Sequence, residues 1–240
     1  MSSSQRLAGR LALITGASRG LGAALARRFA AEGAHVVLVA RTVGGLEEVD
    51  DAIRSAGGEA ATLLPLDLAE LDKVDALGPA LYERFGRLDV LVANAAVLKA
   101  LSPVAYGDPG HWDPVMTVNL NANYRLIRTL HPLLRAGPAG RVIAVTCSPG
   151  HVPTAFWEAY AVSKAGLESL IGMYAAETAT EAVRVNLVDP GPMRTKLRAT
   201  AYPGEDRDKQ PDPAALTDAF VDLAAADCSD HGRRLALQSA

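Results

Sequence analysis

A tyrosine and a lysine, Tyr160 and Lys164, are the side chains of this sequence best suited to exchange a proton with a substrate. In a helix their i, i+4 spacing puts both on one face. A phenol is a poor acid or base near neutral pH because its ordinary pKa is about 10, and a neighbouring ammonium favours the phenolate. We therefore expect Lys164 to lower the pKa of Tyr160. Such a pair could pass a proton to or from a carbinol oxygen while a nicotinamide exchanges hydride with its carbon.

A glycine-rich turn near the start of the chain has the composition that close contact with a phosphate requires. It reads Thr15-Gly-Ala-Ser-Arg-Gly-Leu-Gly22, directly after an expected strand at 11–15 and at the start of an expected helix at 20–32. Glycine has no side chain to block a ligand, and a helix N-terminus offers free N–H groups and a partial positive charge. A tight turn can use glycine for structural reasons alone, but in this context we favour nucleotide binding.

Two arginines indicate which dinucleotide this turn would bind. In such folds the end of the second strand meets the adenosine ribose, where an acidic residue would hold two hydroxyls. Here Ala40 and Arg41 stand at that place, and Arg19 lies within the glycine-rich turn. Either arginine alone is consistent with an ordinary surface charge, but two guanidinium groups near one point suit a 2′-phosphate better than a diol. The sequence therefore favours NADP(H) over NAD(H).

Apolar segments of strand length alternate with longer segments of helical period along the chain. Strands are expected at 11–15, 35–40, 60–66, 89–93, 141–147, 184–188 and 235–237, and helices at 20–32, 46–55, 71–85, 114–135 and 158–180. This alternation is typical of a parallel sheet covered on both faces. It predicts a single α/β domain with a Rossmann-type, doubly wound parallel sheet over residues 9–240, preceded by an N-terminal tail at 1–8.

One segment, 196–213, departs from this alternation. It contains Tyr202-Pro-Gly, a mixed run of charges and Pro211-Asp-Pro213. A long irregular insert in a compact α/β chain is usually a functional lid or a mobile loop, and a solvated surface loop is the alternative. We expect this segment to be a substrate loop.

The composition excludes several classes of protein. The chain has 240 residues and a net charge of −3, which argues against nucleic-acid binding because neutralising phosphates needs clustered Lys and Arg. No apolar run approaches the roughly 18 residues of a membrane span, and residues 1–6 lack the apolar core of a secretion signal. The two cysteines and five histidines show no disulfide framework or metal-ligand spacing. We expect a cytoplasmic globular protein that binds no metal, nucleic acid or membrane.

Taken together, the motifs resemble those of the short-chain dehydrogenase/reductase family. They follow the family's order: the glycine-rich turn, Asn94-Ala-Ala96, Asn119, Tyr160-x-x-x-Lys164 and Asp189-Pro-Gly-Pro-Met-Arg-Thr195. The resemblance covers nearly the whole chain, from Leu11 to about Leu237. The segment from Pro190 to Asp206 also looks like a bacterial subgroup of the family with no settled substrate.

The resemblance implies roles for individual residues. Tyr160 would be the proton donor or acceptor, Lys164 would hold the nicotinamide ribose and tune Tyr160, and Asn119 would anchor a water that links Lys164 to solvent. The other cofactor contacts would come from the glycine-rich turn, the strand ends and the segment that closes over the nicotinamide: Gly16, Ser18, Arg19, Gly20, Leu21, Arg41 at the 2′-phosphate, Asp67 and Leu68 at the adenine, Asn94 beneath the ribose, and Pro190, Gly191 and Thr195.

The sequence departs from the family pattern at the catalytic serine. That serine stands three residues before a glycine and about thirteen before the tyrosine, a position held here by Cys147. A thiol is a weaker hydrogen-bond donor than a hydroxyl, and losing a donor to the substrate oxygen can cost about 10²–10³ in rate. Ser148 is the alternative, but neighbours on a strand face opposite sides, and Pro149 favours extended angles at Ser148. We favour Cys147. Two smaller departures are Ala96 in place of glycine and Asp189 in place of asparagine.

These features predict an oxidoreductase that transfers hydride between NADP(H) and a carbonyl or secondary alcohol, with Tyr160 handling the proton. The alternative is an NADP(H)-binding protein with weak or no catalysis, for which Cys147 is the argument. A small carbonyl or alcohol compound is the expected substrate. By the family's example, the two long helices at 114–135 and 158–180 would pair between subunits of a homodimer or homotetramer.

Overall fold

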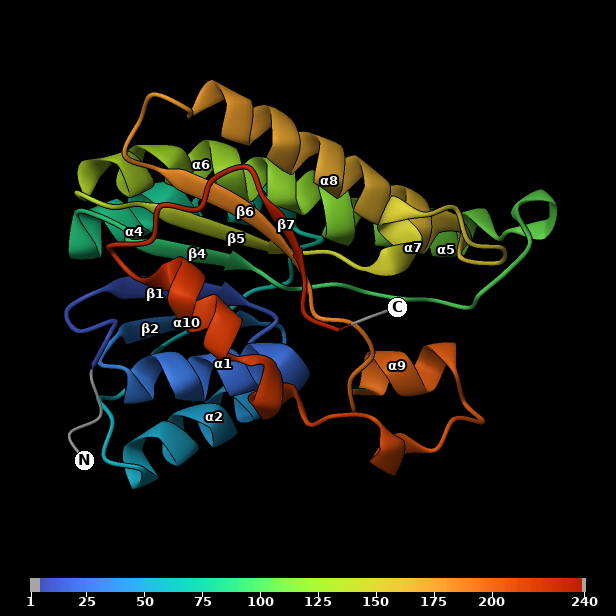
Figure 1. Ribbon diagram of the computed structural model, residues 1–240, viewed down its shortest axis with the longest axis horizontal. Coiled ribbons are helices and arrows are strands. Elements are labelled where there is room, and N and C mark those ends of the chain that lie inside the picture. Colours follow the sequence, from blue (N-terminus) through green and yellow to red (C-terminus); the bar gives the residue numbers. More distant parts are fainter. Residues whose placement is uncertain (1–4, 239–240) are drawn as a thin grey trace.

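A parallel sheet forms the centre of the computed structural model, which describes residues 5–238 (Figure 1). Its seven strands are β1 Leu11–Thr15, β2 His35–Ala40, β3 Thr62–Pro65, β4 Val90–Ala93, β5 Arg141–Val145, β6 Arg184–Asp189 and β7 Arg234–Ala236. The order across the sheet is β3-β2-β1-β4-β5-β6-β7, with every neighbouring pair parallel. The chain thus winds from β1 outward to β3, and then from β4 outward to β7. This reversal creates a crevice at the carboxyl ends of β1 and β4, where ligands bind in such sheets.

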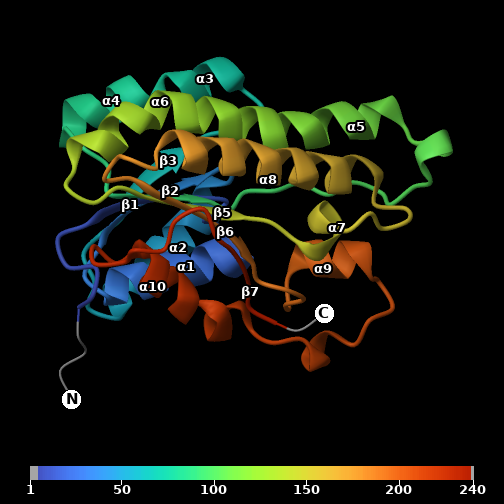
Figure 2. The same cartoon turned by 45° about the horizontal axis from the view of Figure 1, so that its top comes forward.

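Two layers of helices cover the sheet (Figure 2). One layer holds α1 (Gly20–Ala31), α2 (Val43–Ser55) and α10 (Asp218–Ala224), and the other holds α3 (Leu71–Asp75), α4 (Leu77–Phe85), α6 (Ala122–Ala136) and α8 (Glu158–Glu177). Because strand side chains alternate between faces, each strand feeds two apolar cores. Ile14 lies in the same core cluster as Phe29 of α1, whereas its neighbour Leu13 lies in the other cluster, with Leu126 of α6. The predicted single domain with a Rossmann-type sheet is confirmed.

Two predicted boundaries are wrong. Leu7, expected in a tail, is fully buried in the core beside α1, and its N–H donates to the carbonyl oxygen of Glu32 (2.9 Å). The folded domain therefore begins before residue 9, while residues 1–4 lie outside the described part of the chain. The helix expected at 71–85 is two helices, α3 and α4. The break puts Pro79 in the first turn of α4, where its missing N–H costs no helical hydrogen bond.

The long helix expected at 114–135 starts earlier and is interrupted. Its first part, α5 (Pro109–Met116), begins where the Asp108 carboxylate accepts the N–H of Gly110 (2.8 Å). A π-helical segment, Thr117–Asn121, then precedes α6. Such segments occur frequently at functional sites, and this one contains Asn119.

The segment at 196–213 is more regular than expected. It contains α9 (Lys196–Ala201), which begins where the Thr195 hydroxyl oxygen accepts the N–H of Arg198 (3.2 Å), and a 3₁₀ turn, Arg207–Lys209. The strand expected at 141–147 ends at Val145, and a one-turn helix, α7 (Ser148–His151), begins three residues later. Among residues 5–238, none of the helices is long and apolar enough to cross a membrane.

Candidate active site

The glycine-rich turn after β1 is packed so closely that its glycines leave no room for a side chain. Gly16 has a φ of +67°, and a Cβ there would lie 2.9 Å from the Cα of Ala95. A Cβ at Gly22 would lie 2.2 Å from the carbonyl oxygen of Gly16. Gly20 opens α1 with a φ of +55°, and no side chain of the described residues caps this helix. The first N–H groups of α1 are therefore available to a phosphate, so the turn fits the predicted cofactor.

Thr15 and Asn94 hold this turn against the end of β4. Asn94 Nδ2 donates to the carbonyl oxygen of Thr15 (2.8 Å), and the Thr15 hydroxyl oxygen accepts the N–H groups of Asn94 and Ala95 (3.0 Å each). Asn94 is thus fixed in the crevice, at the place predicted to lie beneath a ribose. Thr15 was not predicted to contribute. A hydroxyl at the end of an otherwise apolar, fully buried strand is the signal that could have identified it.

Arg41 and Asp67 meet beyond the ends of β2 and β3. Their closest nitrogen–oxygen distance is 3.7 Å, and the Arg41 side chain is 58% exposed. Leu68 next to Asp67 is buried, whereas Arg19 is exposed at the start of α1. Because a guanidinium has five N–H donors, this single long contact leaves Arg41 able to bind a phosphate as well.

Tyr160 and Lys164 lie buried on one side of α8, with exposed fractions of 7% and 1%. Lys164 Nζ donates to the carbonyl oxygen of Val145 at the end of β5 (2.7 Å) and lies 5.9 Å from the centre of the Tyr160 ring. Burial lowers the pKa of Lys164, and burial raises the pKa of Tyr160 well above its ordinary value. The predicted lowering of the Tyr160 pKa is therefore wrong, because the loss of hydration on burial favours the neutral phenol.

Cys147 and Ser148 point to different partners. Cys147 packs with Tyr160 in an apolar cluster, and burial, with smaller contributions from Cys147 and Asp189, raises the pKa of the phenol. The Ser148 hydroxyl instead donates to Oδ2 of Asp189 (3.0 Å). We expected Ser148 to be extended and to face away from Cys147 as its neighbour on a strand. Instead, Ser148 is the first residue of α7, and this helix directs its hydroxyl to Asp189. Pro149 sits in the first turn of that helix, where proline is tolerated.

Asn119 is fully buried and joins two segments that flank the site. Its Oδ1 accepts the N–H of Val97 (2.8 Å), and its Nδ2 donates to the Val97 carbonyl oxygen (3.0 Å) and to Ser163 Oγ (3.1 Å). The π-helical segment thereby ties the loop after β4 to α8, one residue before Lys164. Ser163 was not predicted, and its place beside Lys164 on α8 is the signal for it. The predicted water beside Asn119 stays a prediction.

The segment Pro190–Thr195 passes over the glycine-rich turn. A Cβ at Gly20 would lie 3.3 Å from Cγ2 of Thr195, which shows how close the two segments are. Gln238 holds the start of this segment, since its Nε2 donates to the carbonyl oxygens of Pro190 and Pro192 (2.7 Å each). Gln238 gave no sequence signal, because a lone glutamine near a chain end fits no motif.

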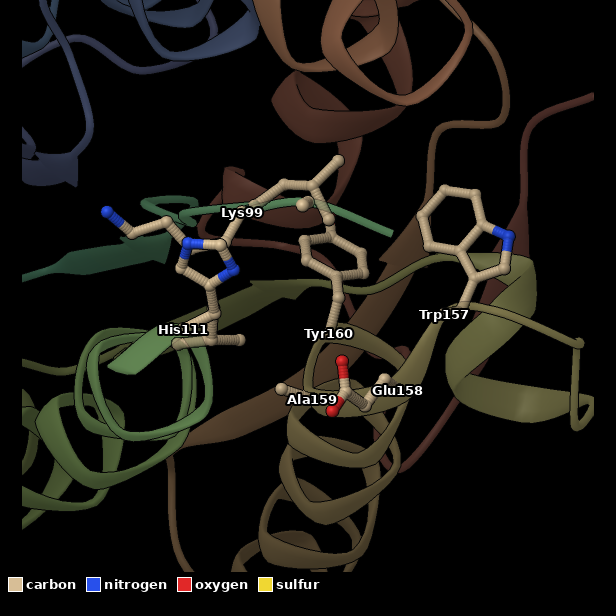
Figure 3. A pocket seen from close by; sticks show the side chains of 9 residues that line it. Lys99, His111, Trp157, Glu158, Ala159 and Tyr160 are labelled. Atoms are coloured by element: carbon tan, nitrogen blue, oxygen red, sulfur yellow. The ribbon is translucent and has the colours of Figure 1, made fainter. Parts of the chain in front are cut away.

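A small pocket lies beside Tyr160 (Figure 3). Its lining combines apolar residues with four ionisable side chains, and comprises Leu98, Ala100, Val115, Trp157 and Ala159 together with Lys99, His111, Glu158 and Tyr160. In Figure 3 the Tyr160 ring stands between Trp157 and His111. The Trp157 ring is centred 5.5 Å from that of Tyr160 and 6.0 Å from that of Tyr202, which brings the end of α9 to the pocket wall.

A phosphate cradle at the switch point of a doubly wound sheet, with a buried tyrosine–lysine pair beside a pocket, defines the class of dinucleotide-dependent oxidoreductases. Within that class, the chain belongs to the short-chain dehydrogenase/reductase family. Residues 10–206 match the family model described as short chain dehydrogenase.

The relatives agree with this assignment over nearly the full length of the chain. YciK of Escherichia coli strain K12, an uncharacterized oxidoreductase, is 34% identical over 220 residues, which are 91% of this chain and 87% of YciK. A short chain dehydrogenase from Pseudomonas syringae superposes with a TM-score of 0.95 at 37% identity, covering 99% of this chain and 98% of that one. A short chain dehydrogenase from Escherichia coli CFT073 in complex with NADPH also has a TM-score of 0.95, at 33% identity, covering 99% and 100%.

Proposed function

We propose that this protein transfers hydride between NADP(H) and the carbon of a carbonyl or secondary alcohol, with Tyr160 as the proton donor or acceptor. The observation that carries the proposal is the convergence of Cys147, Tyr160 and Lys164 beyond the carboxyl end of β5, beside a pocket. The structure of the relative from Escherichia coli CFT073 with NADPH supports the same cofactor for this chain.

NADP(H), when bound, would supply or accept the hydride. The chain would hold it mainly through backbone N–H groups and short side chains of the glycine-rich turn, with Arg41 and Arg19 at the 2′-phosphate. The full set proposed is Gly16, Ser18, Arg19, Gly20, Leu21, Arg41, Asp67, Leu68, Asn94, Tyr160, Lys164, Pro190, Gly191 and Thr195.

Tyr160 is suited to give a proton to a carbonyl oxygen. Its raised pKa keeps the buried phenol protonated at neutral pH, and a protonated phenol is the form that a donor needs. Lys164, held by the Val145 carbonyl oxygen, would in its protonated form place a positive charge near the oxygen that becomes negative in the reaction. Because reduction and oxidation pass through the same transition state, Tyr160 and Lys164 would serve either direction of the reaction.

Cys147 occupies the position from which a hydroxyl would donate to the same substrate oxygen. Burial raises the pKa of its thiol, so the thiol stays neutral and retains its proton for a weak hydrogen bond. Catalysis would therefore proceed with a weaker second donor. The alternative, an NADP(H)-binding protein with little catalysis, rests on this one substitution, and the intact Asn119, Tyr160 and Lys164 argue against it.

Tyr160→Phe separates the two functions. The variant should keep the affinity for NADPH, because the phenol proton is used only in the reaction, and should lose at least about 10²-fold in turnover. The measurement is NADPH oxidation, followed by absorbance, across a panel of ketones and aldehydes, with cofactor binding followed by fluorescence. Lys164→Ala is the comparison and should weaken both binding and turnover. A Tyr160→Phe variant that reduces the best substrate at the native rate would contradict the mechanism.

We also propose that the chain forms a homo-oligomer. Helices α6 and α8 carry large apolar side chains that are half exposed in the single chain, namely Tyr124, Val162 and Met173. Pairing these helices between two subunits would cover such side chains, as the family resemblance implies. A homodimer or homotetramer is therefore the proposed state, and light scattering on the purified protein measures it.

A further inference from the structure

The two residues on either side of Cys147 are both anchored to carboxylates, one partly buried and one buried. The Thr146 hydroxyl donates to Oε1 of Glu168 on α8 (2.6 Å). The Ser148 hydroxyl donates to Oδ2 of Asp189 at the end of β6 (3.0 Å). Thr146 and Ser148 thus point away from Tyr160 while Cys147 packs against it.

One arginine joins the two carboxylates. Arg234 on β7 donates from Nε to Oε1 of Glu168 (3.2 Å) and from its terminal nitrogen to Oδ2 of Asp189 (2.9 Å). The carboxylate side chains are only 14% and 5% exposed. Oδ1 of Asp189 also accepts the N–H of Gly191 (3.0 Å), in the segment that passes over the glycine-rich turn. At the outer edge, His151 Nδ1 lies 3.2 Å from Oε2 of Glu168.

We infer that Asp189 and Glu168, bridged by Arg234, are positioning residues that hold Cys147 against Tyr160 and place negative charge behind the reacting groups. The inference rests on the proposed function for its effect on catalysis, but not for its effect on the thiol itself. None of the five anchoring side chains, Thr146, Ser148, Glu168, Asp189 and Arg234, was predicted to take this role.

The charge of this network reaches the reacting groups. One guanidinium faces two carboxylates, so the network is negative overall, with the exposed His151 as the remaining ionisable neighbour. Asp189 and Glu168 both raise the pKa of Cys147, which Lys164 opposes. They also raise the pKa of Lys164, and Asp189 raises that of Tyr160. The network therefore favours the protonated forms of all three groups.

A purely structural ion pair would give different results from a positioning network. If Arg234 only joined β7 to α8, removing any partner would loosen the same contact and change the site in one direction. In the inferred network, the carboxylates and the guanidinium shift the pKa of Cys147 in opposite directions. Removing a carboxylate makes the surroundings of Cys147 less negative, and removing the guanidinium makes them more negative.

The test is a titration of the Cys147 thiol by the pH dependence of its alkylation with iodoacetamide, followed by mass spectrometry, in a Cys228→Ser background with NADPH absent. Asp189→Asn should move the midpoint to lower pH by about one pH unit, and Glu168→Gln should move it in the same direction. Arg234→Gln should move it to higher pH. Asp218→Asn, which alters an exposed carboxylate paired with Arg28 elsewhere on the surface, is the matched control and should leave the midpoint unchanged.

Steady-state kinetics with NADPH and the best ketone tests the positioning role. Ser148→Ala and Thr146→Val remove one anchor each without changing charge. Each should lower kcat a few-fold with the dissociation constant of NADPH unchanged, and the loss from Ser148→Ala should shrink when Asp189 is already asparagine.

Two results would overturn the inference. In the first, Asp189→Asn and Glu168→Gln have the same midpoint as the control. In the second, Arg234→Gln moves the midpoint in the same direction as the two carboxylate variants. The thiol titration needs no substrate, so it reads the network even if the protein reduces no carbonyl. If the wild-type protein shows no turnover but the variants show the predicted shifts of the midpoint, the proposed function is wrong and the inferred network stands. Should Asp189→Asn fail to fold, as judged by NADPH binding, Glu168→Gln and Arg234→Gln still give the two opposite shifts.

Discussion

The two sides of the crevice present different kinds of surface to a ligand. On the side of β1 and α1, the surface is backbone, with glycines packed so closely that a Cβ at Gly22 would lie 2.2 Å from a carbonyl oxygen. On the side of β5, α8 and β6, the surface is made of side chains whose directions depend on partners from several elements. The difference indicates that the first side tolerates no added atom, whereas the second depends on which donor or charge stands at each position.

The strongest test of this contrast is a single methyl group on the backbone side. Gly22→Ala should abolish measurable NADPH binding, a loss of about 10²-fold or more, because the new Cβ must displace the Gly16 carbonyl and with it the phosphate cradle. Gly44→Ala is the matched control, since a Cβ at this helical glycine meets no atom within 4 Å. Titration of both variants with NADPH measures the effect. Equal affinities would show that the turn does not bind the diphosphate.

The charge at the edge of the backbone side should decide between the two dinucleotides. Arg41→Asp should reverse the preference from NADPH to NADH, because it removes an attraction to the 2′-phosphate and adds a repulsion. As Arg41 is 58% exposed, solvent screening limits the expected change in relative affinity to about tenfold for the lost contact alone. Arg54→Asp, on the exposed side of α2, is the charge-matched control. Dissociation constants for both cofactors give the answer, and a native protein that binds the two equally would refute the assignment.

On the side of β5, α8 and β6, replacing the thiol of Cys147 with a hydroxyl should raise turnover. Cys147→Ser should raise turnover on a small ketone by about tenfold, because a hydroxyl is a stronger donor than a thiol at the same place. Ser148→Ala should have a smaller effect, a few-fold at most, since its hydroxyl bonds to Asp189. The reverse pattern, with Ser148→Ala inactive and Cys147→Ser neutral, would mean that Ser148 faces the substrate. Rates are compared after each variant is shown to bind NADPH.

The same contrast explains what could be read from the sequence. The strand–turn–helix unit at residues 11–40 was predicted almost residue for residue, because backbone constraints leave local signals: apolar runs, and glycines at fixed spacing. The family was also predicted correctly from the order of its motifs. Positions such as Arg41 and Asp67 meet in space because parallel strands end at one edge.

What the sequence did not predict lies in contacts between distant elements. Nothing local to Glu168 or Arg234 indicates that they meet behind Cys147, because the sheet order that joins β5, β6 and β7 sets their distance. The π-helical turn at 117–121 and the short helix α7 also depend on tertiary contacts. The direction of the Tyr160 pKa was mispredicted for the same reason: the spacing to Lys164 is local, but burial is a property of the whole fold.

Transfer of a deuteride shows whether this chain reduces a carbonyl with Tyr160 as the proton donor. Wild-type protein is mixed with NADPH carrying deuterium at the reacting carbon and with the best ketone from the panel, and the alcohol product is analysed by mass spectrometry. We expect one deuterium on the carbinol carbon with the wild type and no labelled product with Tyr160→Phe, although both bind NADPH. Unlabelled alcohol, or labelled alcohol formed equally well by Tyr160→Phe, would contradict this expectation.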